Sequence, residues 1–279
     1  MQIGFLAVAA LVAFAANSVL TRAALALGEI EPGAFAALRM TSGAIMLVLL
    51  VVLRNGGHRN LLHHGQLGGV VALLLYMLGF SFAYLRLDTG LGALILFGGV
   101  QVTMFAGAMV GGERPQPGRW LGALLGLLGL AILVWPGDIA PDPFSAALML
   151  LAAVGWGVYS LYGRRPGPAL AKTAANFLWA SPVALLVWGI APGEIPASGL
   201  GITLAIASGA LASGMGYAIW YAVLPRLDAS LAAVIQLTVP ILALLGGVVF
   251  LGEALTLRFA IAAILILGGV GIAVRKSPK

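Results

Sequence analysis

The chain has 279 residues, of which 61% are apolar and only 9% are charged; 39 are glycine and none is cysteine. Because a soluble domain carries about 25% charged residues, this composition excludes a soluble globular fold and predicts a membrane protein. The lack of cysteine excludes disulfides, thiolate catalysis and cysteine-ligated metals. The formal charge of +6 bears on membrane topology and gives no reason to expect nucleic-acid binding.

Ten apolar segments follow one another along the chain. They are 3–21, 32–53, 65–85, 89–112, 120–137, 143–163, 173–193, 195–225, 229–252 and 254–274. All lack Asp, Glu, Lys and Arg, except for Arg39 in the second segment and Arg258 in the last. A helix of about 20 apolar residues crosses a bilayer core of about 30 Å, and the segments show no alternation typical of barrel strands. We therefore predict an all-α membrane protein with ten transmembrane helices.

The positive residues predict the orientation of the chain, because Lys and Arg collect in cytoplasmic loops. With a cytoplasmic N-terminus, eleven of the fifteen Lys and Arg residues lie on the cytoplasmic side, whereas seven of the nine acidic residues lie on the other. Both termini, and the loop that holds His58, His63 and His64, are therefore predicted to be cytoplasmic. No basic residue precedes the first segment, which favours a membrane span over a cleaved signal peptide.

The sequence contains an internal repeat. A shift of 140 residues places 86–134 on 226–274 without a gap, and both copies begin with Arg-Leu-Asp. The repeat predicts two units, 1–138 and 139–279, of five helices each. Because five is odd, the second unit must enter the membrane from the opposite side. Two inverted five-helix repeats are typical of alternating-access carriers, which bind substrate between the halves.

Each copy of the repeat also carries a glycine- and alanine-rich helix, Gly-Glu and a second glycine-rich helix. This pattern resembles the EamA-type domains of the drug/metabolite transporter superfamily, and Asn17 and Arg39 agree with it. The run 92–104, Gly-Ala-Leu-Ile-Leu-Phe-Gly-Gly-Val-Gln-Val-Thr-Met, is similar to YddG-type aromatic amino-acid exporters. The resemblance implies a carrier in the bacterial cell inner membrane that exports small metabolites, above all amino acids, including aromatic ones.

Two features concern helix packing. Pro240 is predicted to break the ninth segment, whereas its repeat mate Val100 leaves the fourth unbroken. Glycine-rich faces in the fifth and tenth segments predict close contact between helices. Their residues are Gly122, Gly126, Gly129, Gly268, Gly269 and Gly271.

Polar and aromatic side chains inside the segments are the candidates for substrate binding, because polar groups at such depth usually face the bundle interior. The aromatic ones recur at helical spacing, which also suits simple packing. An aromatic and polar site would fit a zwitterion with a bulky side chain. The candidates are Asn17, Arg39, Tyr76, Phe80, Gln101, Trp156, Tyr159, Tyr217 and Trp220.

Arg39 lies about 10 Å from the outer end of its segment, at a rise of about 1.5 Å per residue. An arginine at this depth is costly unless it snorkels, has a structural partner or faces a wet interior. One reading is therefore structural. The other is a guanidinium that lines an outer vestibule and attracts a substrate carboxylate.

The acidic residues near the helix ends are given structural roles. Asp88 and Asp228 precede the fourth and ninth segments and are predicted to be N-caps. Glu113 and Glu253 follow Gly112 and Gly252 in tight interfacial turns. The segment interiors hold no Asp, Glu or His, so a proton-coupled mechanism has no embedded titrating group and facilitative transport is expected.

Two alternative functions are weighed against the carrier. An exporter of cationic compounds with proton coupling would need a buried carboxylate. The segment interiors contain none, so only Glu113 or Glu253, folded inward, could supply it. An intramembrane enzyme would have only Ser, Asn and Arg for chemistry, without the usual catalytic motifs. No metal or other cofactor is expected, since the three His residues share one loop. A complete repeat pair in one chain lets a monomer suffice, with the lipid bilayer and amino acids as its partners.

Overall fold

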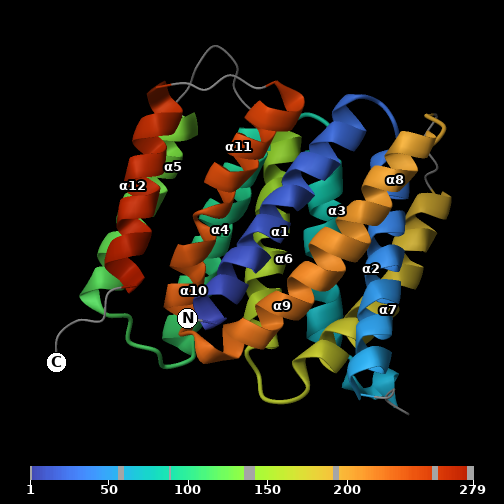
Figure 1. Cartoon of the computed structure of the whole chain (residues 1–279), viewed down its shortest axis with the longest axis horizontal. Coiled ribbons are helices and arrows are strands. Elements are labelled where there is room, and N and C mark those ends of the chain that lie inside the picture. The colour runs from blue at the N-terminus through green and yellow to red at the C-terminus, as the bar shows by residue number, and fades with distance from the viewer. Residues whose placement is uncertain are drawn as a thin grey trace.

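The computed structural model describes residues 2–55, 60–87, 89–134, 142–190, 195–252 and 257–274. These residues form one bundle of helices (Figure 1) and contain no β-strand. The first half consists of α1 (Gln2–Ala26), α2 (Pro32–Asn55), the short 3-10 helix η1 (Leu61–His64), α3 (Leu67–Ala83), α4 (Thr89–Val110) and α5 (Pro117–Val134).

The second half begins with α6 (Pro143–Gly163) and α7 (Ala169–Ile190). The eighth crossing combines α8 (Gly199–Ala207), the π-helix η2 (Ser208–Met215) and α9 (Gly216–Val223), and the 3-10 turn η3 (Leu224–Arg226) follows it. The last two crossings are α10 (Ala229–Gln236) with α11 (Val239–Leu251), and α12 (Leu257–Val274).

These helices confirm an all-α protein with ten apolar crossings. Among the described residues, six helices are long and apolar enough to span a bilayer, and four shorter apolar helices complete the set. The start of α1 and the end of α12 lie on the same side of the bundle (Figure 1), as an even number of crossings requires.

The break at Pro240 is confirmed. α10 ends at Gln236 and α11 begins at Val239, with the proline in its first turn. Proline has no N–H to donate, and its ring clashes with the carbonyl of the preceding turn, so a proline kinks or breaks a helix. The ninth crossing is broken at Pro240, whereas α7 continues through Pro182. In the first half, α4 continues unbroken through Val100.

The helices of the two halves pack against each other in pairs. α2 lies on α7, α5 lies on α12, α3 and α4 lie on α6, and α1 lies on α9 and α11. At the α5–α12 contact, a Cβ on Gly269 would lie 2.7 Å from the carbonyl oxygen of Gly122. The predicted close contact is confirmed there and at Gly126 and Gly129. It is wrong for Gly268 and Gly271, where a Cβ would meet nothing within 4 Å.

Asp142 caps the N-terminus of α6. Its carboxylate accepts hydrogen bonds from the backbone N of Ser145 at 2.9 Å and from the Ser145 hydroxyl at 2.8 Å. These two hydrogen bonds, with a smaller contribution from Arg86 at 3.6 Å, lower the pKa of the Asp142 carboxyl. The cap therefore stabilises the fold above the unfolded-state pKa of about 4, and this contribution is lost as the pH falls through the folded-state pKa.

We expect Asp142→Ala to lower the thermal unfolding midpoint of the detergent-solubilised protein at pH 7, because the first turn of α6 loses its acceptor. The difference from the wild type should shrink as the pH falls below about 4. A difference that stays constant with pH would contradict the role given to the ionised carboxylate.

Candidate functional site

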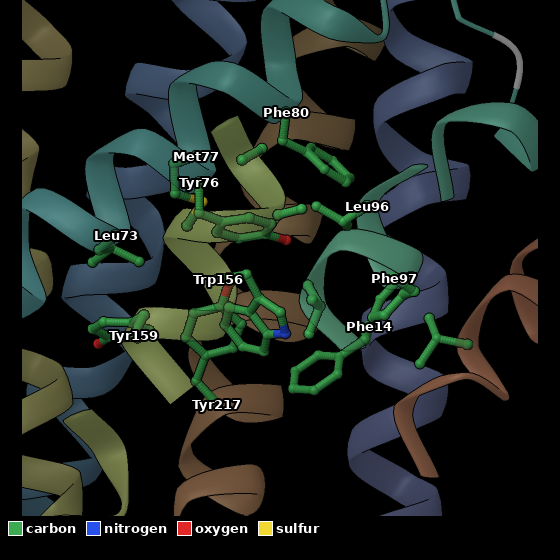
Figure 2. Packing of buried hydrophobic residues seen from close by; sticks show 14 of the residues in the cluster. Phe14, Leu73, Tyr76, Met77, Phe80, Leu96, Phe97, Trp156, Tyr159 and Tyr217 are labelled. Atoms are coloured by element: carbon green, nitrogen blue, oxygen red, sulfur yellow. The ribbon is translucent and has the colours of Figure 1, made fainter. Parts of the chain in front are cut away.

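The nine predicted site residues are all buried, and the most exposed, Tyr76, has 5% of its surface accessible. Five of them, Tyr76, Phe80, Trp156, Tyr159 and Tyr217, are aromatic residues that lie close together in the buried core (Figure 2). The Trp156 ring lies 5.1 Å from Tyr76 and 4.9 Å from Tyr217, measured between centroids. Phe80 and Tyr159 extend this cluster at either side, at 5.5 Å from Tyr76 and 6.2 Å from Trp156.

Phe14 is a member of the aromatic cluster that the sequence analysis missed. Its ring makes edge contacts with Trp156 at 5.1 Å, with Trp220 at 5.6 Å and with Tyr217 at 5.7 Å. The signal was available, because residues three apart share a helix face and Phe14 stands three residues before Asn17. We call Phe14, Tyr76, Trp156 and Tyr217 the central aromatic cluster.

Arg39 lies beside this cluster, with no exposed surface. Its Nε donates to the Ser213 hydroxyl at 3.1 Å, and its Nη2 donates to the Tyr76 hydroxyl at 3.0 Å. The guanidinium carbon also lies 4.9 Å from the Phe80 ring centre, a cation–π distance. The side chain therefore does not snorkel to the membrane surface, and its remaining nitrogen, Nη1, is buried without a hydrogen-bond partner.

Asn17 joins the same polar centre from α1. Its Oδ1 accepts from the hydroxyl of Ser208 at 2.8 Å and from that of Ser213 at 3.3 Å. Its Nδ2 has no partner and is buried. Ser213 thus connects Asn17 to Arg39, and each of these two residues keeps one NH2 nitrogen without a hydrogen-bond partner.

Both serines belong to the π-helix η2, which no pattern in the sequence predicted. A π-helix widens the turn and often occurs at functional sites. Gly209 lets η2 approach α2 closely, because a Cβ there would lie 2.8 Å from the Arg39 Cα and would overlap the Arg39 carbonyl oxygen. This contact sets the distance between Ser213 and Arg39.

Gln236 connects the aromatic cluster to the break in the ninth crossing. Its Oε1 accepts from the Trp156 indole Nε1 at 2.7 Å. Its Nε2 contacts the Met104 sulfur at 3.2 Å and the Ala232 carbonyl at 3.1 Å. Gln101, by contrast, is buried in α4, and neither of its side-chain polar atoms has a hydrogen-bond partner.

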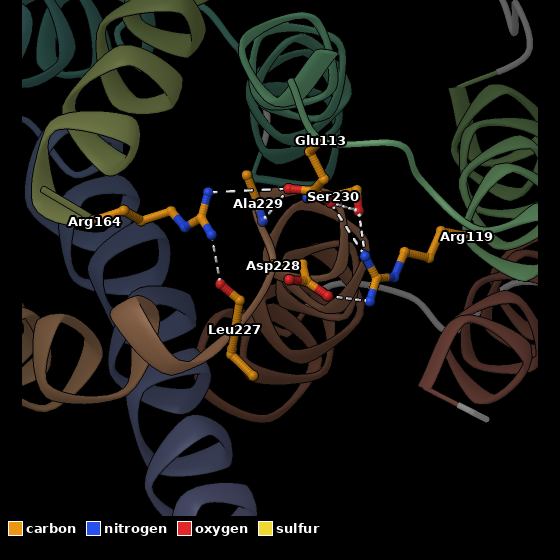
Figure 3. A network of polar contacts seen from close by, with 7 residues as sticks. All are labelled: Glu113, Arg119, Arg164, Leu227, Asp228, Ala229 and Ser230. Carbon is orange, nitrogen blue, oxygen red and sulfur yellow. Dashed lines mark hydrogen bonds and ion pairs between the residues drawn. The ribbon is translucent and has the colours of Figure 1, made fainter. Parts of the chain in front are cut away.

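A second polar network joins the two halves at one end of the bundle (Figure 3). Glu113 follows α4, and its carboxylate accepts from the backbone N atoms of Ala229 and Ser230 at 2.9 and 3.2 Å. It also accepts from the Ser230 hydroxyl and from Arg119 Nη1 at 3.1 Å, and Arg164 Nη1 lies 4.0 Å away.

Asp228 was predicted to cap α10 with its side chain, and this prediction is wrong. Asp228 occupies the N-cap position of α10, but its side chain accepts no capping hydrogen bond and pairs with Arg119 instead. Glu113 supplies the acceptor, because the turn after α4 brings its carboxylate to the free amides of α10. Asp88 and Glu253 lie outside the described residues.

A narrow cleft lies at the end of the bundle where α6 ends and α7 begins, and it extends as far as Tyr159. Its lining residues are Gln66, Tyr159, Tyr162, Gly163, Ala169, Lys172, Thr173, Asn176 and Tyr221. Tyr159 separates this cleft from Trp156. In the part of the chain that the structure describes, no group of three His, Cys, Asp or Glu side chains could hold a metal ion. His58 lies outside it.

Known proteins resemble this chain over two thirds of its length or more. Residues 2–135 and 143–275 each match the model of the EamA-like transporter family. An uncharacterized protein of Pseudomonas aeruginosa is 45% identical and covers 96% of this chain and 92% of its own. A probable amino-acid metabolite efflux pump of Salmonella typhimurium is 28% identical over 67% of each chain. One solved crystal structure has a TM-score of 0.76 and 25% identity, and it covers 95% of this chain and 97% of its own.

Proposed function

Because the chain belongs to the EamA-like transporter family, we propose that it is a bacterial inner-membrane carrier that exports small metabolites, above all amino acids, including aromatic ones. The buried aromatic cluster beside Arg39 and Asn17 is the observation that carries this proposal. Apolar walls with a few fixed polar groups are typical of small-molecule sites. The printed name of the Salmonella relative agrees with an amino-acid metabolite as the substrate.

We further propose that residues 1–138 and 139–279 are inverted repeats that alternate access to this cluster. Two separate family matches support the repeat. The packing of α2 on α7, and of α5 on α12, also pairs helices at equivalent positions of the two units. The cluster takes side chains from both units, and carriers with inverted repeats bind substrate at the interface between their units. On this proposal both termini are cytoplasmic and a monomer suffices.

The proposed transport is facilitative. Among the described residues, no Asp, Glu or His belongs to the buried set that surrounds the cluster, and an arginine does not release its proton in a protein. A proton-coupled exporter of cations would need such a group, and Glu113 is instead occupied as the cap of α10. An intramembrane enzyme is the more distant alternative, and the family and relatives are transporters.

The test is flux of labelled amino acids in liposomes that contain the purified protein. We expect Trp156→Ala and Tyr217→Ala to weaken the apparent affinity for phenylalanine by about tenfold, because each removes one aromatic wall. Transport of alanine should change little. A pH gradient imposed at equal substrate concentration on both sides should produce no sustained accumulation.

Trp188→Ala is the matched control, since it removes a tryptophan that is 36% exposed on the outside of the bundle. It should leave both affinities unchanged. Phenylalanine flux at the wild-type rate in correctly inserted Trp156→Ala and Tyr217→Ala variants would refute the site. Accumulation that collapses with a protonophore would refute facilitative transport.

A further inference from the structure

The charge of Arg39 is not balanced by any carboxylate among the described residues. Its partners are the neutral hydroxyls of Ser213 and Tyr76 and the ring of Phe80. A buried cation without a counter-ion is unfavourable in an apolar medium, so such groups are usually paired or face a ligand. The unpartnered Nη1 shows that the guanidinium has capacity for one more acceptor.

The two polar side chains that Ser213 joins each keep an unpartnered group that can only donate. Arg39 Nη1 and Asn17 Nδ2 are both buried without a hydrogen bond, whereas the unpartnered hydroxyl of Tyr217 in the cluster can donate or accept. The Asn17 oxygen already accepts from two serine hydroxyls. A carboxylate only accepts, so it matches this set. An ammonium only donates, and it would also lie close to a guanidinium of the same charge.

We infer that the ligand of this centre is recognised as an anionic carboxylate with an apolar, preferably aromatic, body, and that an α-ammonium group is not required. The inference rests on the proposed carrier function and sharpens it. The carboxylate would take the free N–H groups of Arg39 and Asn17, which Ser213 holds together. The apolar body would lie against the central aromatic cluster (Figure 2). Within this cluster, the Tyr76 ring centre lies 5.5 Å from the Arg39 guanidinium carbon.

Three compounds with one phenylethyl skeleton test this inference. 3-Phenylpropionate carries only the carboxylate, phenylalanine carries both charged groups, and 2-phenylethylamine carries only the ammonium. The dissociation constant of each is measured with the purified full-length protein, from the rise of its unfolding midpoint with ligand concentration. We expect 3-phenylpropionate to bind at least as tightly as phenylalanine, and 2-phenylethylamine to bind at least about tenfold more weakly.

Variants of Arg39 give the second readout. Arg39→Gln should weaken binding of both carboxylates by at least about tenfold, because it removes the charge that attracts them. Binding of the amine should not weaken, because the same change removes a like charge. Arg39→Lys keeps the charge without the planar fork, so its affinity for the two carboxylates should lie between that of the wild type and that of Arg39→Gln. If Arg39→Gln fails to fold, the wild-type series and Arg39→Lys still decide the question.

Two results would overturn the inference. One is 2-phenylethylamine binding as tightly as phenylalanine, as expected if the aromatic faces hold an ammonium by cation–π contact. The other is phenylalanine that binds and is transported while 3-phenylpropionate does not bind, which would leave the carrier function intact. Binding of 3-phenylpropionate without any amino-acid flux would support the carboxylate site and contradict amino-acid export.

Discussion

Gly209→Ala is expected to destabilise the protein by about 3 kcal/mol, at the upper end for an overpacked core. The added Cβ would overlap the Arg39 carbonyl oxygen and the Ser42 hydroxyl, both on α2. A helix backbone cannot rotate away as a flexible side chain can, so η2 must move. Because Ser213 lies on η2 and accepts from Arg39, substrate flux should fall together with the unfolding midpoint in detergent.

Gly268→Ala is the matched control, because a Cβ there meets nothing within 4 Å and alanine favours a helix over glycine. It should leave flux unchanged and keep or slightly raise the unfolding midpoint. If Gly209→Ala behaves like Gly268→Ala, the close approach of η2 to α2 is not as described, and the geometry of the Arg39 site fails with it.

Glu113→Ala is expected to lower stability by about 3 kcal/mol, comparable to the loss of one partner from a buried ion pair. The change removes the acceptor for the amides of Ala229 and Ser230 and leaves Arg119 without one of its carboxylates. The side chains of Glu113 and Arg119 are only 17% and 12% exposed, so water replaces these contacts poorly. Thermal unfolding of the purified variant measures the effect.

Asp228→Ala removes the ion pair with Arg119 and leaves the capping of α10 by Glu113 in place. Its side chain is 54% exposed, so its loss should cost no more than about 1 kcal/mol, as for a surface ion pair. Equal destabilisation by Glu113→Ala and Asp228→Ala would show that the pairing with Arg119, and not the capping of α10, accounts for the stability of this network.

Several features could be predicted from the sequence because they depend on one segment alone. The ten crossings followed from the length of apolar stretches, and the break in the ninth crossing followed from the missing N–H of Pro240. The grouping of the candidate aromatic residues in the buried core followed from helical spacing, which places side chains three or four residues apart on one face. Phe14 satisfied the same rule with respect to Asn17 and was overlooked.

Other features could not be predicted because they depend on which segments lie side by side. Asp228 fits the local rule for an N-cap, but the amide of Ala229 donates to Glu113 instead. Glu113 lies 116 residues before Ala229 in the chain. Gly268 and Gly269 are neighbours in one glycine-rich stretch of α12, yet of the two only Gly269 faces α5. The partner of Arg39 on η2 lies 174 residues away, beyond any pattern of short range.

Composition and hydropathy by themselves established a membrane protein of ten helices, because the free energy of placing a segment in hydrocarbon depends mainly on its own side chains. The repeated pattern indicated the carrier family, which the family matches confirm. Only the tertiary structure decided that Arg39 is buried rather than snorkelling, that Ser213 joins it to Asn17, and that Nη1 is left unpartnered. Hydrogen bonding of a buried group depends on every neighbour within about 3 Å, and those neighbours come from helices far apart in the chain.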